Sequence, residues 1–231
     1  MIYKVNLLTE SECSGISTKV QELREFWTQR NETLPFYTLG KASYLDAVRD
    51  KENYYRAAQI YNPILQKNFG KLYERLSHSL STILGNSVTY YEKAALPGFH
   101  VFLAHKAFEL PMGSIHMDLQ YKLLDWQLPE PIDSYPWISF TLVISLPKSG
   151  GGLNLWDVHY QDVNKLSQVE FSNLIREREN KFCNYRVGMM IIHSGHQVHQ
   201  IAPAKNIVSS DMRITLQGHA LFFYNTWHLY W

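Results

Sequence analysis

The hydrophobic pattern of the chain changes near residue 86. Before that point, apolar residues recur every three or four positions, as they do on one face of an α-helix. This spacing is seen at residues 18–30 and 44–58. A third helix is predicted to begin at Asn62-Pro63, a capping residue and a first-turn proline, and to end at Gly85. We therefore expect residues 1–87 to form a helical region that packs on the rest of the chain.

After Gly85 the apolar residues follow the shorter period of β-strands. Glycine and proline turns, such as Pro97-Gly98, separate the strand candidates. The polar stretch 162–181 is expected to be an insertion loop or helix at the rim. Many short strands after a helical block predict a mainly β domain, residues 88–231, buttressed by the N-terminal helices in one structural unit. The predicted strands are residues 88–93, 99–105, 114–121, 137–146, 152–158, 187–193, 198–202, 212–220 and 221–231.

Residues 212–219 alternate strictly between apolar and polar side chains. Ile214 and Leu216 fall on one face of the predicted strand, whereas Arg213, Thr215 and Gln217 fall on the other. In a simple sandwich the polar face would meet solvent. In a barrel that holds a ligand, the same face would line the interior. The pattern by itself allows both arrangements.

Composition narrows the function classes. The chain has 231 residues, 45% of them hydrophobic and 19% charged, which is typical of a globular protein. The net charge of +1 argues against a nucleic-acid surface. Cys13 and Cys183 are the only cysteines, so we do not expect a disulfide framework. We expect instead a reduced, cytoplasmic location. The sequence has neither a signal-peptide pattern nor an apolar run long enough to span a membrane.

Candidate metal ligands occur in two separate predicted strands. His116 and Asp118 are two residues apart, so both can face one ion while Met117 points away. His199 lies in a later predicted strand and could supply a third ligand. Two histidines and one carboxylate suit ferrous iron and leave coordination positions open for other molecules.

A competing metal site is present in the same region. His193, His196 and His199 are spaced by three residues, which on a helix would gather them on one side as a possible zinc site. Ser194-Gly195 interrupts this segment, however, and an apolar run precedes it. We therefore predict a strand, a turn and a second strand, with His193 and His196 at the rim or behind the metal ligands.

With these residues in this order, the sequence resembles the 2-oxoglutarate/Fe(II)-dependent oxygenase superfamily. The resemblance covers about residues 88–220 and includes Arg213-x-Thr215 after the second histidine. It implies a double-stranded β-helix, or jelly roll. It implies that His116, Asp118 and His199 bind iron and serve as the catalytic residues. It also implies that Arg213 and Thr215 bind the far carboxylate of the co-substrate 2-oxoglutarate, and that O₂ is consumed.

The resemblance implies a dioxygenase that hydroxylates or otherwise oxidises a C–H bond. A small metabolite or natural-product intermediate is the expected substrate, with neither nucleic acid nor a membrane as a partner. A peptide or protein side chain is the alternative substrate. A cupin-like metal protein that does not use 2-oxoglutarate is the alternative function. Further pocket candidates are Tyr121, Thr141, Trp156 and Gln217.

Overall fold

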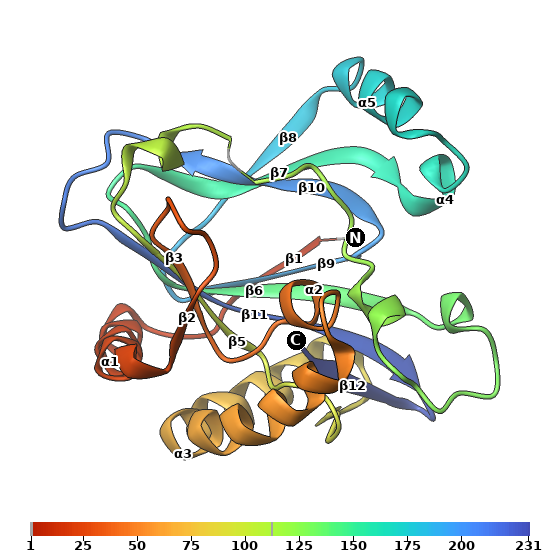
Figure 1. The fold of residues 1–231 in the computed structure, drawn as a ribbon, viewed down its shortest axis with the longest axis horizontal. Helices are drawn as coiled ribbons and strands as arrows, with labels where there is room; N and C mark the ends of the chain where they lie inside the picture. Colours follow the sequence, from red (N-terminus) through yellow and green to blue (C-terminus); the bar gives the residue numbers. More distant parts are fainter. Residues whose placement is uncertain (1, 112) are drawn as a thin grey trace.

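Two β-sheets stacked face to face form the centre of the molecule (Figure 1). The computed structural model describes residues 2–111 and 113–231. The larger sheet has the order β1 (Ile2–Asn6), β9 (Met189–His193), β6 (Trp137–Ser145), β11 (Met212–Phe223), β5 (Gly98–Leu103), β3 (Phe36–Leu39) and β2 (Trp27–Gln29). Strand β12 (Thr226–Tyr230) pairs with β11 and with β4 (Ser87–Tyr90). The smaller sheet has the order β10 (Gln197–Ala204), β7 (Gly150–His159) and β8 (Asn180–Asn184). The expected jelly-roll architecture is confirmed.

Strand β11 shows how the sequence pattern builds the two layers. Ile214 and Leu216 are fully buried in the core shared with the longest helix. Arg213 and Thr215, which alternate with them, are buried on the opposite face of the strand. Because both faces are buried, the polar face lines the interior instead of meeting solvent. The structure thus selects the ligand-holding barrel from the two arrangements that the alternation allowed.

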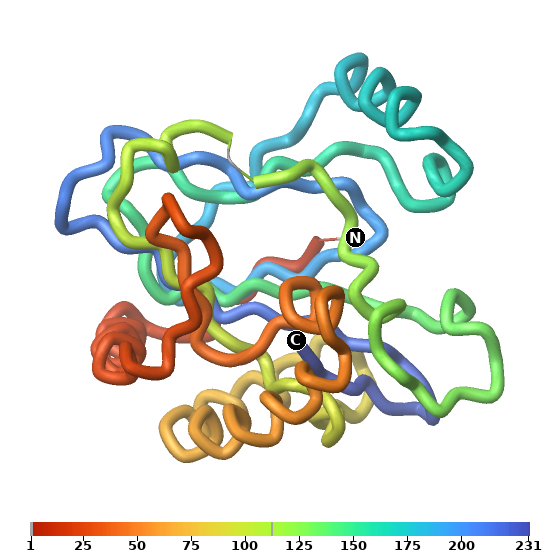
Figure 2. Tube along the Cα trace, viewed as in Figure 1, coloured from red at the N-terminus to blue at the C-terminus, as the bar shows by residue number. Residues whose placement is uncertain are grey.

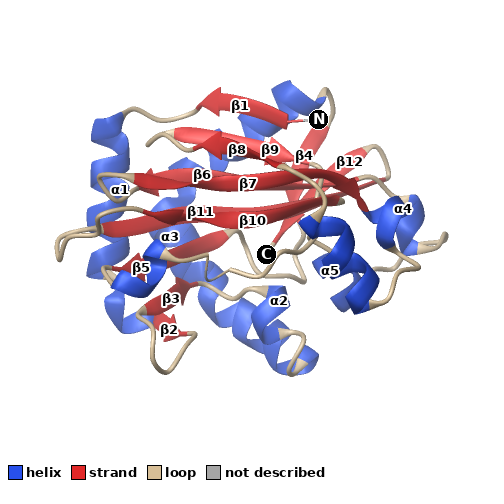
Figure 3. Cartoon of the chain, turned by 90° about the horizontal axis from the view of Figure 1, so that it is seen from above, coloured by secondary structure: helices blue, strands red, loops and turns tan. Residues whose placement is uncertain are grey.

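Helices cover the outside of the larger sheet and one end of the smaller one. Helix α3 (Lys51–Leu84) lies under the larger sheet, as Figures 1 and 3 show from two directions, and α1 (Glu10–Glu22) lies beside it. Helices α4 (Tyr160–Val163) and α5 (Gln168–Arg176) follow β7. In the described residues, no helix has both the length and the apolarity needed to cross a bilayer.

Helix α3 is longer than its sequence pattern predicts. It begins at Lys51, where the Asp50 side chain caps the first turn, and it continues through Pro63. Asn62 is therefore not a cap, and its side chain instead bonds the backbone of the loop before β5. Proline removes one helical hydrogen bond, but burial of the apolar stripe on both sides of it keeps the helix together. Gly85 ends the helix as predicted, with a left-handed φ of 71°.

The N-terminal region is not only helical, which corrects the expectation for residues 1–87. Strand β1 pairs with β9, and β3 pairs with β5, so this region contributes three strands to the larger sheet. Residues 18–30 end in a 3₁₀ turn and β2, and residues 44–58 are divided between α2 (Ser43–Asp46) and α3. Trp27 belongs to the β2–β3 hairpin, where its ring packs on Tyr37. Such short edge strands carry too few residues for a period of two to appear in the sequence.

Most strands predicted after Gly85 are confirmed. Strand β11 runs past its predicted end at residue 220, to Phe223, before β12 begins. Two other stretches differ from the prediction. Residues 114–121 form no regular strand, and their only pairing with β10 is a bridge between His116 and His199. The polar stretch 162–181 contains α5, as the rim helix expected there, but it also runs into β8, which was missed. Strand β8 is largely exposed, and its Asn and Lys residues break the apolar alternation by which a strand is predicted from the sequence.

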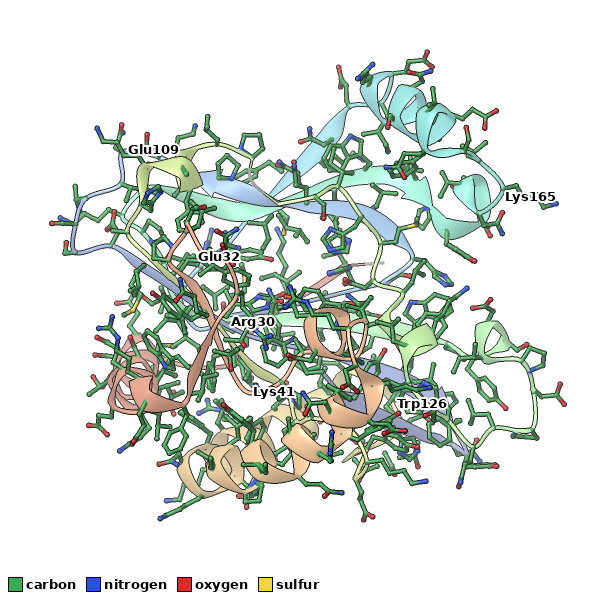
Figure 4. All side chains as sticks on the ribbon, viewed as in Figure 1. Arg30, Glu32, Lys41, Glu109, Trp126 and Lys165 are labelled. Carbon is green, nitrogen blue, oxygen red and sulfur yellow. The ribbon has the colours of Figure 1, made fainter. Side chains whose placement is uncertain are left out.

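The β2–β3 hairpin and α2 bring the N-terminal region to the interior of the barrel. In Figure 2 the hairpin (orange-red) rises from the larger sheet toward the smaller one. Figure 4 shows Glu32, in the hairpin loop, in front of the space between the two layers. Arg30 of the hairpin holds α2 by a bidentate ion pair with Asp46, with N–O distances of 2.7 Å.

Candidate metal centre

Backbone pairing brings the two parts of the candidate metal site together. The His116 amide donates to the His199 carbonyl at 2.9 Å, and the His199 amide donates back at 2.8 Å. Two residues further on, the Asp118 amide donates to the Gly195 carbonyl at 2.8 Å. This pairing aligns His116 and Asp118 alongside the start of β10. The three side chains predicted to bind metal therefore meet although they are far apart in the sequence.

The ligand atoms of these three residues form a compact cluster. One atom from each lies within 4.8 Å of the others. The Nε2 of His116 lies 3.6 Å from Oδ1 of Asp118, and the Nε2 of His199 lies 3.4 Å from Oδ2. Burial alone would raise the pKa of Asp118, but the neighbouring His199 and His116 lower it well below its usual value. An ionised carboxylate with two imidazoles is a donor set that suits a divalent iron ion.

Hydrogen bonds orient all three side chains. The Nδ1 of His116 bonds the Ser114 carbonyl at 2.9 Å, and the Nδ1 of His199 bonds the Gln197 carbonyl at 2.8 Å. A carbonyl oxygen only accepts, so each Nδ1 must carry the proton, which leaves the lone pair of Nε2 free for a metal. The Gln120 amide donates to Oδ1 of Asp118 at 3.0 Å and fixes the carboxylate.

The competing arrangement of three histidines does not form. Residues 193–199 adopt the predicted strand, turn and strand, so no helix gathers His193, His196 and His199. The His193 ring does lie near His199, with centroids 4.7 Å apart, and its Nδ1 bonds the Ser194 carbonyl. His196 packs instead between Trp137 and Tyr160. His193 thus stands behind a ligand, and His196 belongs to a packed aromatic cluster.

Arg213 is a buried cation with unused hydrogen-bond donors. Its Nη1 donates to the Ala202 carbonyl at 3.3 Å, whereas Nε and Nη2 have no partner. The rings of Phe102 and Tyr185 lie 6.0 and 5.4 Å from the guanidinium carbon. A buried charge without a counterion is costly, and a guanidinium pairs best with a carboxylate. Thr215, fully buried on the same strand face, also has an unpartnered hydroxyl.

One cavity joins the metal cluster to Arg213. Its volume is about 340 Å³, and its walls include His116, Asp118, His199 and Arg213. This volume is within the range of small-molecule sites, and it is larger than a short keto acid needs. The unpartnered guanidinium and the His-Asp-His donor set thus fit a metal ion together with a carboxylate ligand.

Other residues of the cavity wall were only partly visible in the sequence. Thr141 and Gln217, predicted as pocket residues, line the cavity, whereas Tyr121 and Trp156 are packed in hydrophobic clusters away from it. His219, which was not among the predicted pocket residues, lines the cavity and bonds Ser139. Its place on the polar face of β11 was the signal that could have identified it.

The N-terminal region contributes a wall residue that sequence reasoning missed. Tyr44 of α2 lines the cavity, and its hydroxyl lies 2.5 Å from Nε2 of His100 on β5. Burial, together with the nearby Arg213, lowers the pKa of His100 to about 3, so this imidazole is neutral. Tyr44 is in the N-terminal region, where the sequence carried no motif.

No protein-family model matches the sequence, and no curated protein matches it. Solved structures do resemble it. An N-substituted L-amino acid dioxygenase from Burkholderia ambifaria AMMD, in complex with alpha-KG, aligns over 99% of this chain and 85% of its own, with a TM-score of 0.60 and 12% identity. A second structure of that dioxygenase aligns over 82% of this chain and 72% of its own (TM-score 0.52, 14% identity). EvdO2 from Micromonospora carbonacea var. aurantiaca aligns over 95% and 85% (TM-score 0.51, 13% identity). The chain therefore has the fold of the Burkholderia dioxygenase.

Proposed function

We propose that the protein is a non-haem Fe(II)/2-oxoglutarate-dependent dioxygenase that oxidises a C–H bond of a small molecule. The observation that carries the proposal is one cavity that brings together two binding groups. They are a His-Asp-His donor set suited to a divalent metal ion and the buried guanidinium of Arg213, whose Nε and Nη2 have no hydrogen-bond partner. A keto diacid satisfies both at once because it can chelate the metal at one end and pair with a guanidinium at the other.

Each residue has a distinct task in this proposal. His116, Asp118 and His199 would hold the iron on one side and leave the other side open. The charge of Asp118 offsets part of the charge of the ion. Arg213 binds the far carboxylate of 2-oxoglutarate. Thr215 is not among the residues that line the cavity, but its buried hydroxyl has no partner and lies on the same strand face, so we assign it as a second donor. The aromatic rings of Phe102 and Tyr185 keep water from the guanidinium, which strengthens its pairing with the carboxylate.

Bound iron supplies the chemistry that these side chains lack, the activation of O₂ for oxidation of an inert C–H bond. In the overall reaction, 2-oxoglutarate and O₂ give succinate and CO₂, and the remaining oxygen atom enters the substrate as a hydroxyl group. The protein holds the co-substrate in one orientation and provides a cavity in which a second molecule can approach the open side of the metal.

Succinate formation tests this proposal. The protein is incubated in air with Fe(II) and 2-oxoglutarate, with and without a mixture of small metabolites, and succinate is quantified by mass spectrometry. We expect succinate from the native protein, more of it when a substrate is present, and none above background from His199→Ala. The variant His196→Ala, which changes a histidine outside the cluster, is expected to retain the reaction. Equal succinate from native protein and His199→Ala would contradict the proposal.

A further inference from the structure

The charged groups of the cavity are few, and each of them has an assigned partner. Among the cavity-lining residues that the structure describes, the acidic and basic side chains apart from histidine are Asp118, Asp211 and Arg213. Under the proposed function, Asp118 serves the metal and Arg213 serves 2-oxoglutarate. Asp211 accepts hydrogen bonds from the backbone amides of Val208 at 2.9 Å and Lys148 at 3.4 Å, so it is used to hold its own loop.

The remaining hydrogen-bonding groups of the wall are uncharged. Tyr44 and His100 are paired with each other, and His100 is neutral because it is buried. The wall also carries the hydroxyls of Ser139, Thr141 and Tyr185, the amides of Asn31 and Gln217, and the imidazole of His219, which bonds Ser139. These groups can bind a hydroxyl, a carbonyl or an amide. None of them can neutralise an ammonium, a carboxylate or a phosphate of a second ligand.

The rest of the wall is apolar and comes from three separate elements. Leu34 and Phe36 belong to the β2–β3 hairpin, Phe108 and Leu110 to the turn after β5, and Ile207 to the loop after β10. The Phe36 ring stacks on Phe102 at 4.4 Å, and Phe102 meets Phe108 edge to face at 5.3 Å. Leu110 is 61% exposed, so the cavity reaches the surface at an apolar rim.

Resting on the proposed function, we propose that the substrate is an uncharged compound with an apolar body, an alkyl or aryl skeleton with one or two hydroxyl, carbonyl or amide groups. Its apolar body lies against the hairpin and the turn after β5, and its polar group bonds the uncharged part of the wall. Entry of a charged group would leave that charge buried without a partner, because Asp118 and Arg213 are already occupied and both carboxylate oxygens of Asp211 are held by amides of its own loop and of Lys148. Free amino acids, phosphorylated compounds and polycations are thus excluded from the cavity.

Matched probes that differ in charge test this inference by binding. The protein is loaded with Zn(II) and 2-oxoglutarate, so that no oxidation occurs, and is titrated by calorimetry. One probe series is 2-phenylethanol, phenylacetate and 2-phenylethylamine, and a second is tryptophol, indole-3-acetate and tryptamine. We expect each alcohol to bind at least tenfold more tightly than its acid and its amine. Equal or tighter binding of the charged probes, or the failure of all probes to bind, would overturn the inference.

A charged substitution at the rim of the cavity tests whether the probes bind inside it. Leu110→Glu introduces an anion at a position of the cavity wall that is 61% exposed, so we expect the variant to fold normally. We expect this variant to bind the alcohols more weakly and the amines more tightly than the native protein does. The matched control is Val208→Glu, which adds the same charge at an exposed position that does not line the cavity. If both variants, or neither, change the order of the probes, binding occurs outside the proposed cavity and the inference fails.

The outcome also separates this inference from the proposed function. Preferred binding of the acids that disappears in Arg213→Leu would mean that 2-oxoglutarate does not occupy Arg213, which contradicts the proposed function. Preferred binding of acids or amines that persists in Arg213→Leu would contradict only the uncharged character of the substrate. Calorimetric binding of 2-oxoglutarate to the Zn(II)-loaded protein is measured first and establishes which case applies.

Discussion

At the scale of single residues, each ligand histidine uses its two ring nitrogens for different tasks. Nδ1 is fixed on a backbone carbonyl, and Nε2 points toward Asp118. We predict that His199→Ala loses tight binding of divalent iron because one of three protein ligands is removed, whereas His196→Ala keeps it. Metal content after anaerobic loading and gel filtration measures this directly. Metal loss in His196→Ala with retention in His116→Ala would instead favour the alternative cluster of His193, His196 and His199.

The candidate ligands could be chosen from the sequence because their chemistry is local. Residue types and the spacing of His116 and Asp118 are visible in the chain, and the polar face of β11 pointed to Arg213. Tyr44 and the role of His219 could not be chosen in this way. They reach the cavity only through the packing of α2 and the register of β11 on β6, and neither leaves a spacing in the sequence.

At the scale of elements, one part-buried ion pair, Arg30–Asp46, holds α2, and with it Tyr44, against the barrel. We predict that Arg30→Met lowers the free energy of unfolding by about 2–3 kcal/mol, because the part-buried carboxylate of Asp46 loses its partner. Lys51→Met is the control, since it removes an exposed pair with Asp125 and is expected to cost less than about 1 kcal/mol. Urea unfolding of both variants measures the difference. Equal losses would show that the Arg30 pair is as weak as a surface pair.

The start of β5 has no room for a side chain. A Cβ on Gly98 would lie 2.1 Å from the Trp231 ring and 2.7 Å from the Leu39 carbonyl oxygen. We predict that Gly98→Ala destabilises the protein by about 1–3 kcal/mol, because ring and strand must move apart. In α1, Gly15 has nothing within 4 Å of a Cβ, so Gly15→Ala should stabilise by roughly 0.5–1 kcal/mol. The thermal unfolding midpoint is expected to fall in Gly98→Ala and to rise in Gly15→Ala. Shifts of the same sign in the two variants would contradict this account.

Element prediction succeeded where one pattern ran over many residues, as in α3, β6 and β11. It failed where tertiary contacts decide. Pro63 looked like a helix start, yet packing of α3 on the larger sheet carries the helix through it. β2 and β3 have only three and four residues, and they become strands because β3 pairs with β5 and β2 pairs with β3. His116 and Asp118 were predicted to lie in a strand. In the structure a single bridge to β10 aligns them without a regular strand.

At the scale of the whole molecule, the N-terminal region and the barrel share one sheet. β1 lies at one edge beside β9, and β2 and β3 lie at the other, while α3 shares a core with β5 and β11. We predict that the chain unfolds in a single cooperative transition, with the same urea midpoint by circular dichroism and by tryptophan fluorescence. Two separated transitions would show that residues 1–87 unfold independently of the barrel.

The central claim is that one cavity binds iron at the His-Asp-His cluster and 2-oxoglutarate between the iron and Arg213. The most direct test is a titration of 2-oxoglutarate into anaerobic, Fe(II)-loaded protein, followed by the metal-to-ligand absorption band. We predict saturable binding to the native protein and about ten- to a hundredfold weaker binding to Arg213→Leu, since a charged hydrogen bond contributes about 1.5–3 kcal/mol. Thr215→Val should have a smaller effect. No band in the native protein, or unchanged affinity in Arg213→Leu, would contradict the account.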